Sequence, residues 1–110
     1  MNIGIVGFGK MGEAIAKGLL KEKVYKVYYC EKEKRRIEQI AAKYTQIEYL
    51  NLASLIDKSE AILLAVKPQD IKDLLVEIDS FLKTDKLFIS ICAGISTPFI
   101  QSYLPKARVI

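Results

Sequence analysis

The sequence GFGKMG at positions 7–12 constrains the fold of this chain more than any other feature. It directly follows an apolar run at 3–6 and opens a stretch of helical spacing from about Met11, which indicates a strand, a tight turn and a helix. The first glycine allows the turn, the second lets backbone approach a pyrophosphate, and the third lets the helix lie close to the strand. The motif predicts a dinucleotide site at the helix start, and an ordinary glycine turn is the alternative.

The acidic residue Glu31 lies 19 positions after Gly12, near the spacing at which dinucleotide-binding domains carry an acid for the adenosine ribose. A carboxylate there accepts hydrogen bonds from the ribose hydroxyls of NAD and repels the additional phosphate of NADP. Basic residues at positions 32 and 34–36 favour the opposite preference, because they could hold that phosphate if the loop turned Glu31 aside. The run EKEKRR is alternatively only a solvated helix start, so the choice between NAD and NADP stays open.

Strand-like and helix-like stretches alternate along the whole chain. Strands are expected at residues 3–6, 26–30, 47–50, 61–66, 87–91 and 108–110. The fourth, AILLAV, has no polar alternation, which is typical of a central strand in a parallel sheet covered on both faces. With right-handed crossovers this order predicts a single α/β domain with a Rossmann-type, doubly wound parallel sheet, strand order 3-2-1-4-5-6, and ligand sites at the carboxyl ends of the strands.

Single residues place some helix boundaries. Asn51 is expected to be the N-cap of a short helix, and Thr97 is expected to cap a helix that has Pro98 at its first position. The apolar stripe of the first helix is expected at three positions, Met11, Ile15 and Leu19.

Two later loops at strand ends carry weaker signals. AVKP at 65–68 borders the crevice in which the ribose and nicotinamide of a cofactor lie in this fold, although it also reads as an ordinary strand exit before a helix-starting proline. Small residues at positions 92–94 leave room for a flat ring or simply turn the chain.

The composition excludes several kinds of chemistry. The 110 residues contain no histidine, which excludes a histidine-based triad, histidine metal ligands and an imidazole acid within this chain. The two cysteines, 62 positions apart, do not suggest a metal site, and without a signal-peptide pattern or a long apolar run we expect a cytoplasmic protein with no membrane partner. The net charge of +4 comes from lysines scattered among glutamates, which predicts a solvated surface rather than a nucleic-acid site.

Three motifs occur in this order along the chain: GKMGEAI after the first strand, AVKP after the fourth and SICAGI at 90–95. With these motifs the chain resembles the amino-terminal domain of pyrroline-5-carboxylate reductase over all 110 residues. The resemblance implies an NAD(P)H-dependent oxidoreductase that reduces 1-pyrroline-5-carboxylate to L-proline, the last step of proline biosynthesis. It implies that residues 1–110 are the NAD(P)-binding domain. The family's carboxyl-terminal helical domain, which binds the small imino-acid substrate and forms the homo-oligomer, is expected to be absent from this chain, so the fragment alone is expected to be inactive.

The motifs and the resemblance together assign cofactor contacts but no catalytic residue and no metal ligand. The residues expected to contact the cofactor, NADP or NAD, are Val6, Gly7, Phe8, Gly9, Lys10, Met11, Gly12, Glu31, Lys32, Asn51, Ala65, Val66, Lys67, Pro68, Cys92, Ala93 and Gly94. Glu31 departs from the family, whose members often prefer NADPH and carry a neutral polar residue near this point.

Two other functions stay open. One is the cofactor domain of another oxidoreductase of the 6-phosphogluconate or hydroxyisobutyrate dehydrogenase kind, which shares the Gly-x-Met-Gly loop. The other is a non-catalytic nucleotide-sensing Rossmann domain, whose motif would normally end in an aspartate after the second strand and would need no Lys-Pro loop.

Overall fold

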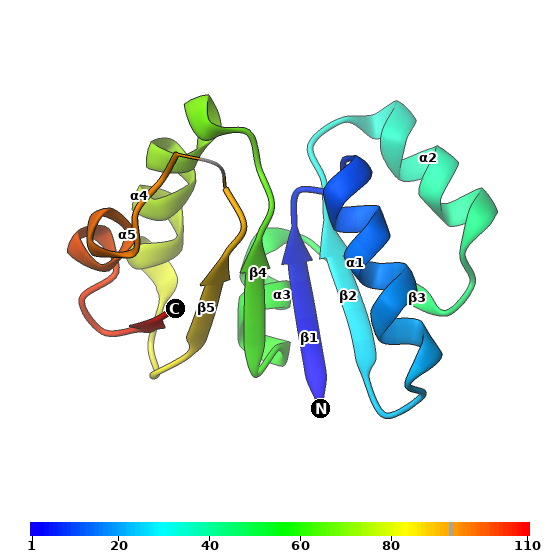
Figure 1. Ribbon diagram of the computed structural model, residues 1–110, viewed down its shortest axis with the longest axis horizontal. Helices are drawn as coiled ribbons and strands as arrows, with labels where there is room; N and C mark the ends of the chain where they lie inside the picture. The colour runs from blue at the N-terminus through cyan, green and yellow to red at the C-terminus, as the bar shows by residue number, and fades with distance from the viewer. Residues whose placement is uncertain (93) are drawn as a thin grey trace.

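A computed structural model describes residues 1–92 and 94–110 and shows a parallel sheet of six strands in the order β3-β2-β1-β4-β5-β6 (Figure 1). The elements in chain order are β1 (Asn2–Val6), α1 (Lys10–Lys21), β2 (Lys26–Cys30), α2 (Lys34–Lys43), β3 (Ile47–Tyr49), α3 (Leu52–Lys58), β4 (Ala61–Leu64), the short 3-10 helix η1 (Pro68–Asp70), α4 (Ile71–Phe81), β5 (Leu87–Ser90), α5 (Thr97–Tyr103) and β6 (Arg108–Val109). The predicted fold class and strand order are confirmed. Because all paired strands are parallel, their carboxyl ends meet at one edge of the sheet, the upper edge in Figure 1.

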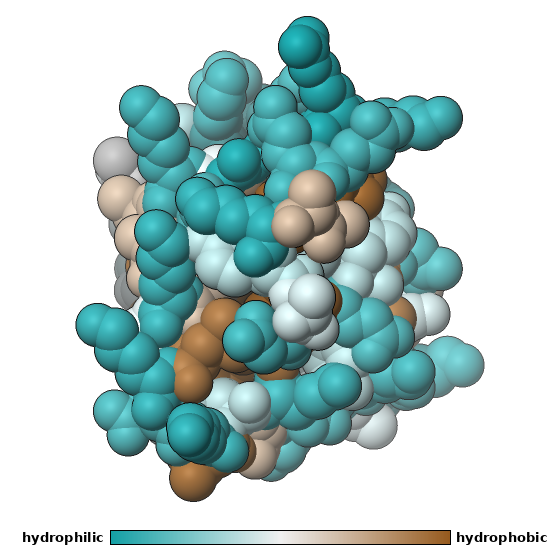
Figure 2. All heavy atoms as spheres, turned by 90° about the vertical axis from the view of Figure 1, so that its right-hand side faces the viewer, coloured by the Kyte–Doolittle hydropathy of each residue, from teal (hydrophilic) through white to brown (hydrophobic). Residues whose placement is uncertain are grey.

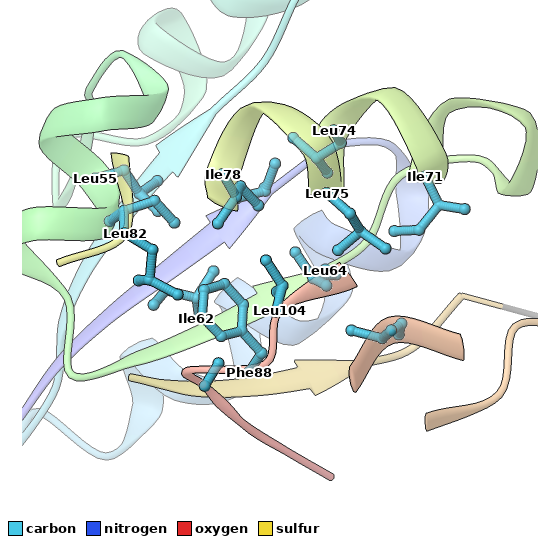
Figure 3. Packing of buried hydrophobic residues seen from close by; sticks show 14 of the residues in the cluster. Leu55, Ile62, Leu64, Ile71, Leu74, Leu75, Ile78, Leu82, Phe88 and Leu104 are labelled. Atoms are coloured by element: carbon cyan, nitrogen blue, oxygen red, sulfur yellow. The ribbon is translucent and has the colours of Figure 1, made fainter. Parts of the chain in front are cut away.

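Helices lie on both faces of the sheet and enclose two apolar cores. One core lies under α1 and α2, and the other lies under α3, α4 and α5. In the second core, Leu75 and Ile78 of α4 pack over Ile62 and Leu64 of β4 (Figure 3). All four residues of β4 are buried, as expected for a central strand between two helical layers.

The strands β4 and β5 end earlier than the sequence indicated. They stop at Leu64 and Ser90, so Ala65 and Val66 lie beyond the sheet, in the loop at its carboxyl edge. Ala65 N still donates to Val6 O at 2.8 Å, but the chain then leaves the sheet for η1. Pro68 has no N–H to continue the ladder, which is consistent with this early exit.

One of the two predicted helix caps is correct. Asn51 caps α3, because its Oδ1 accepts a hydrogen bond from Ser54 N at 2.9 Å. The prediction that Thr97 caps α5 is wrong, because Ser96 holds that place and its Oγ accepts from Phe99 N at 3.2 Å. The backbone carbonyl of Ser96 also accepts the first helical hydrogen bond, so Thr97 and the proline after it both lie inside the helix.

The buried side of α1 differs from the predicted stripe. Met11 is 58% exposed, whereas Gly12 and Ala16 are buried against the sheet, and Ile15 and Leu19 pack only at the margin of the core. The close approach of Gly12 to the loop before the helix accounts for this orientation, since a Cβ at Gly12 would lie 2.6 Å from the carbonyl oxygen of Gly7.

Side chains on the face that carries α2 are mostly hydrophilic, and hydrophobic side chains show there only in small patches (Figure 2). This matches the mixture of lysines and glutamates in the sequence. Within the described residues, no helix is long and apolar enough to cross a membrane.

A Gly4→Ala substitution is expected to destabilise the fold by about 1–3 kcal/mol. Gly4 faces α3, and a Cβ there would overlap Leu55 Cδ2 and Ser59 Oγ, both of which belong to fully buried side chains. Urea unfolding measures the change in the free energy of unfolding. Gly18→Ala is the matched control, because a Cβ added at position 18 would meet nothing within 4 Å. Replacing glycine by alanine inside a helix should stabilise the fold by up to about 1 kcal/mol. A Gly4→Ala chain as stable as the wild type would contradict this packing.

Candidate functional site

The carboxyl ends of β1, β2 and β4 border an open cavity of about 760 Å³. Its walls include nine of the residues predicted as cofactor contacts, which are Val6, Gly7, Phe8, Gly9, Glu31, Lys32, Ala65, Val66 and Lys67. A smaller hollow of about 450 Å³ between α2 and the edge strand β3 includes none of the predicted residues. The glycine loop and the loop after β4 therefore form facing parts of the larger cavity, as the strand order required.

The glycine loop has the geometry that its sequence indicated. Gly7 has a φ of 90°, and a Cβ there would lie 2.9 Å from the carbonyl carbon and oxygen of Ala65, so both the backbone angle and the close approach require glycine. Gly9, in contrast, has an ordinary φ of −79° and open space where its Cβ would be. Nothing in the protein itself thus calls for a glycine at this position.

The amino terminus of α1 adjoins this open space. Gly9 is the N-cap, and within the described chain no side chain caps the helix there. Glu13 N donates to Gly9 O at 3.0 Å, so the N–H groups of positions 10–12 precede the first helical hydrogen bond. Uncapped N–H groups together with the helix dipole favour an anion, by about 0.3–1 kcal/mol for the dipole alone.

The other predicted residues that the structure describes lie outside the walls of the cavity. Lys10, Met11 and Gly12 form the first turn of α1, Asn51 caps α3, and Pro68 begins η1. Gly94 is exposed with a φ of 76°, and Cys92 is buried. Ala93 is outside the described residues. The roles of these residues as cofactor contacts stay predictions.

Cys92 connects the loop after β5 to the loop after β4. Its Sγ lies 2.8 Å from the carbonyl oxygen of Val66 and donates to it. Burial raises the pKa of the Cys92 thiol, and burial beside Glu31 raises the pKa of the Cys30 thiol in the cavity wall. Both thiols therefore stay protonated at neutral pH and are poor nucleophiles.

Glu31 lies against the glycine loop rather than turned aside. Its Oε1 accepts a hydrogen bond from Phe8 N at 2.8 Å, and its Oε2 accepts one from Glu33 N at 3.1 Å. These two contacts fix a negative charge at the end of β2, on the cavity wall. From the sequence, the basic residues could hold a 2′-phosphate only if Glu31 were turned aside. In this structure Glu31 is not turned aside, so that condition is not met.

A cluster around Glu13 joins α1 to α2, and sequence reasoning missed it. The carboxylate accepts hydrogen bonds from Arg36 Nη2 at 2.8 Å, from Lys43 Nζ at 2.7 Å and from the hydroxyl of Tyr44. Arg36 also donates from Nε to the carbonyl oxygen of Phe8 at 2.8 Å. The backbone of Phe8 is therefore held on both sides of its Cα, by Glu31 at the N–H and by Arg36 at the carbonyl.

Several other wall residues also escaped the sequence analysis. They come from the end of β2, from α2 and its N-cap, and from β3, α3, η1 and α4, and they are Cys30, Glu33, Ile37, Tyr49, Leu52, Asp70, Leu74 and Glu77. Only the position of EKEKRR directly after the second strand pointed toward any of them. The wall also includes Arg36, one of the basic residues considered above for a 2′-phosphate. Among the described residues, no group of three or more His, Cys, Asp or Glu side chains is placed to hold a metal ion.

Acid is expected to weaken the fold through Glu13. Hydrogen bonds from Lys43, Tyr44 and Arg36 lower the pKa of Glu13 from 4.5 to about 2. Because the folded-state pKa lies below the unfolded one, ionised Glu13 stabilises the fold above pH 4.5, and this contribution is lost as the pH falls toward 2. Urea unfolding across this pH range should show that the free energy of unfolding depends less on pH in Glu13→Gln than in the wild type. A Glu13→Gln chain with the wild-type dependence would show that the cluster does not hold the carboxylate in solution.

The chain matches the protein family described as NADP oxidoreductase coenzyme F420-dependent over residues 2–94. It is 39% identical to a pyrroline-5-carboxylate reductase of Treponema pallidum over 102 residues, which cover 87% of this chain and 37% of that protein. The curated relatives that it matches are much longer proteins, since the chain spans 37% to 42% of their length.

Solved structures show the same similarity. The 1-pyrroline-5-carboxylate reductase of Streptococcus pyogenes matches with a TM-score of 0.77 and 30% identity, over 98% of this chain and 39% of that one. The pyrroline carboxylate reductase of Plasmodium falciparum, solved with NADP bound, matches with a TM-score of 0.76 and 28% identity, over 94% of this chain and 37% of that one.

Proposed function

The chain belongs to the NADP oxidoreductase family described as coenzyme F420-dependent, and on that premise we propose that it is the cofactor-binding domain of a pyrroline-5-carboxylate reductase. The observation that carries the proposal is the cavity between the glycine loop and the loop after β4, at the strand edge where this fold binds dinucleotides. The similar reductases from T. pallidum and S. pyogenes support 1-pyrroline-5-carboxylate as the substrate. Its reduction gives L-proline as the product.

The described residues fit a nicotinamide dinucleotide. Gly9 leaves room for a pyrophosphate, it is also the N-cap of α1 and so lies next to N–H groups that no side chain caps, and a cavity of about 760 Å³ is within the usual size for a ligand site. In the proposed arrangement the first turn of α1 holds the pyrophosphate, Glu31 faces the adenosine ribose, and Val66 and Lys67 border the nicotinamide half.

When bound, the reduced nicotinamide supplies a hydride to the carbon of the ring C=N bond. The protonated imine is itself the electrophile, so this domain needs to supply neither an acid nor a base, and its task is to position the cofactor. The groups that bind the substrate carboxylate lie, in this proposal, outside residues 1–110. The predicted homo-oligomer and cytoplasmic location stay predictions.

A Glu31→Gln substitution is expected to shift the cofactor preference toward NADPH by on the order of tenfold, because it removes a negative charge beside the proposed 2′-phosphate position. Glutamine keeps an oxygen that accepts from Phe8 N, whereas serine would also remove this support of the loop. Calorimetric titration with NADPH and NADH gives the ratio of the two dissociation constants. Glu22→Gln, at the far end of α1, makes the same charge change as a control. An unchanged ratio in Glu31→Gln would mean that other groups decide the preference.

The substrate assignment is tested by assaying the full-length gene product on 1-pyrroline-5-carboxylate with NADPH and NADH, and on a 3-hydroxy acid with the oxidised cofactors NADP+ and NAD+. We expect reduction of the imino acid alone. Activity only on the hydroxy acid would favour the other oxidoreductase class. Adenine nucleotides without nicotinamide binding as tightly as the dinucleotides would instead favour a nucleotide sensor.

A further inference from the structure

Arg36 lines the cofactor cavity from the first turn of α2, and its guanidinium is held by two oxygens. Its Nε donates to the carbonyl of Phe8 and its Nη2 donates to Glu13, each at 2.8 Å. The side chain is only 25% exposed. It therefore rests on the glycine loop in one defined orientation instead of extending into the cavity from a mobile surface position.

Glu13 is outside the cavity walls but fixes this orientation. Its side chain is 14% exposed, and Lys43 and Tyr44 hold the oxygen that Arg36 does not use. Hydrogen bonds from these residues lower its pKa to about 2, so the carboxylate is charged at neutral pH. A charged, anchored carboxylate both directs the guanidinium and offsets its charge.

We propose that Glu13 is a positioning residue for cofactor choice, which holds Arg36 on the Phe8 carbonyl and so withholds it from the 2′-phosphate of NADP. An arginine near the end of the second strand is the group that accommodates this phosphate in dinucleotide-binding domains, because its planar fork matches phosphate oxygens. Here the fork already donates to two oxygens of the protein. Glu13 thus shifts the cofactor preference toward NAD, as Glu31 does, although it lies outside the cavity walls. The inference rests on the proposed cofactor site.

Titration of the whole chain with NADPH and NADH tests the proposal. In Glu13→Ala the affinity for NADPH relative to NADH should rise about tenfold, the effect expected when a guanidinium regains a charge-assisted hydrogen bond to phosphate. Lys43→Gln is the matched control, because it removes another partner of Glu13 and leaves the bond to Arg36, so the ratio should stay within about twofold of the wild type.

A double variant separates the route through Arg36 from a general charge effect. If Arg36 carries the effect, Glu13→Ala should leave the ratio unchanged in an Arg36→Gln background. A rise of equal size in the Arg36→Gln background would overturn the proposal. The proposal would also be overturned if the NADPH-to-NADH affinity ratio stayed constant or fell in Glu13→Ala alone. A fall would mean that Glu13 presents Arg36 to the phosphate. Should Glu13→Ala fail to fold, Glu13→Gln gives the same test with a smaller expected rise. A wild-type chain that binds neither cofactor refutes the proposed function, whereas binding of both with no dependence on Glu13 refutes only this inference.

Discussion

A Gly9→Val chain is expected to fold like the wild type and to lose at least about a hundredfold in affinity for NADH and NADPH. Its φ of −79° is open to any residue and its Cβ would meet nothing within 4 Å, so the protein itself tolerates a larger side chain. The same space is where the pyrophosphate is proposed to lie, and the loss corresponds to one or two charge-assisted hydrogen bonds of about 1.5–3 kcal/mol each. Urea unfolding and calorimetric titration measure the two properties separately.

Gly18→Ala is the control for Gly9→Val, because a Cβ added at position 18 is equally free of contacts but lies on α1 away from the glycine loop. It should bind both cofactors as the wild type does. If Gly9→Val kept its affinity, the open space at Gly9 would not be the phosphate site. If it unfolded, the glycine would be needed for the fold itself.

The 110-residue chain is expected to bind a dinucleotide weakly but to reduce 1-pyrroline-5-carboxylate many powers of ten more slowly than an intact reductase. Positioning of the two reactants is worth up to about 7–11 kcal/mol, and the groups that would hold the substrate are proposed to lie outside this chain. A steady-state assay with NADPH and 1-pyrroline-5-carboxylate measures the rate. The T. pallidum relative, of which this chain spans 37%, serves as the intact reference. Turnover near the rate of that reference would falsify the claim that substrate binding lies elsewhere.

Local patterns in the sequence were sufficient to predict the fold and part of the site. GFGKMG after an apolar run predicted β1, the turn and α1, because Gly7 and Gly12 each answer a local steric demand. The unbroken apolar run at 61–66 identified the central strand, although β4 ends at Leu64. Asn51 was a correct cap, since its side chain bonds only three residues along the chain.

Contacts that depend on how two helices face one another could not be predicted. Glu13 and its partners Lys43 and Tyr44 are about 30 positions apart, and only the packing of α1 beside α2 brings them together. The exposure of Met11 was missed for another reason: helical spacing gives the side of a helix that is apolar, but here the close contact between Gly12 and the loop decides which side faces the sheet. The error at Thr97 had a local cause, since two adjacent residues are both good caps and only the backbone hydrogen bonds decide between them.

Titration of the isotope-labelled chain with NADH, followed through its backbone amide NMR signals, tests the central claim most directly. The proposed site predicts saturable shifts that cluster in the glycine loop at 7–12, at Glu31 and in the loop at 65–67, with smaller or fewer shifts when ADP replaces NADH. Shifts that cluster instead around the hollow between α2 and β3, or no saturable change with either dinucleotide, would contradict the assignment of this cavity as the cofactor site.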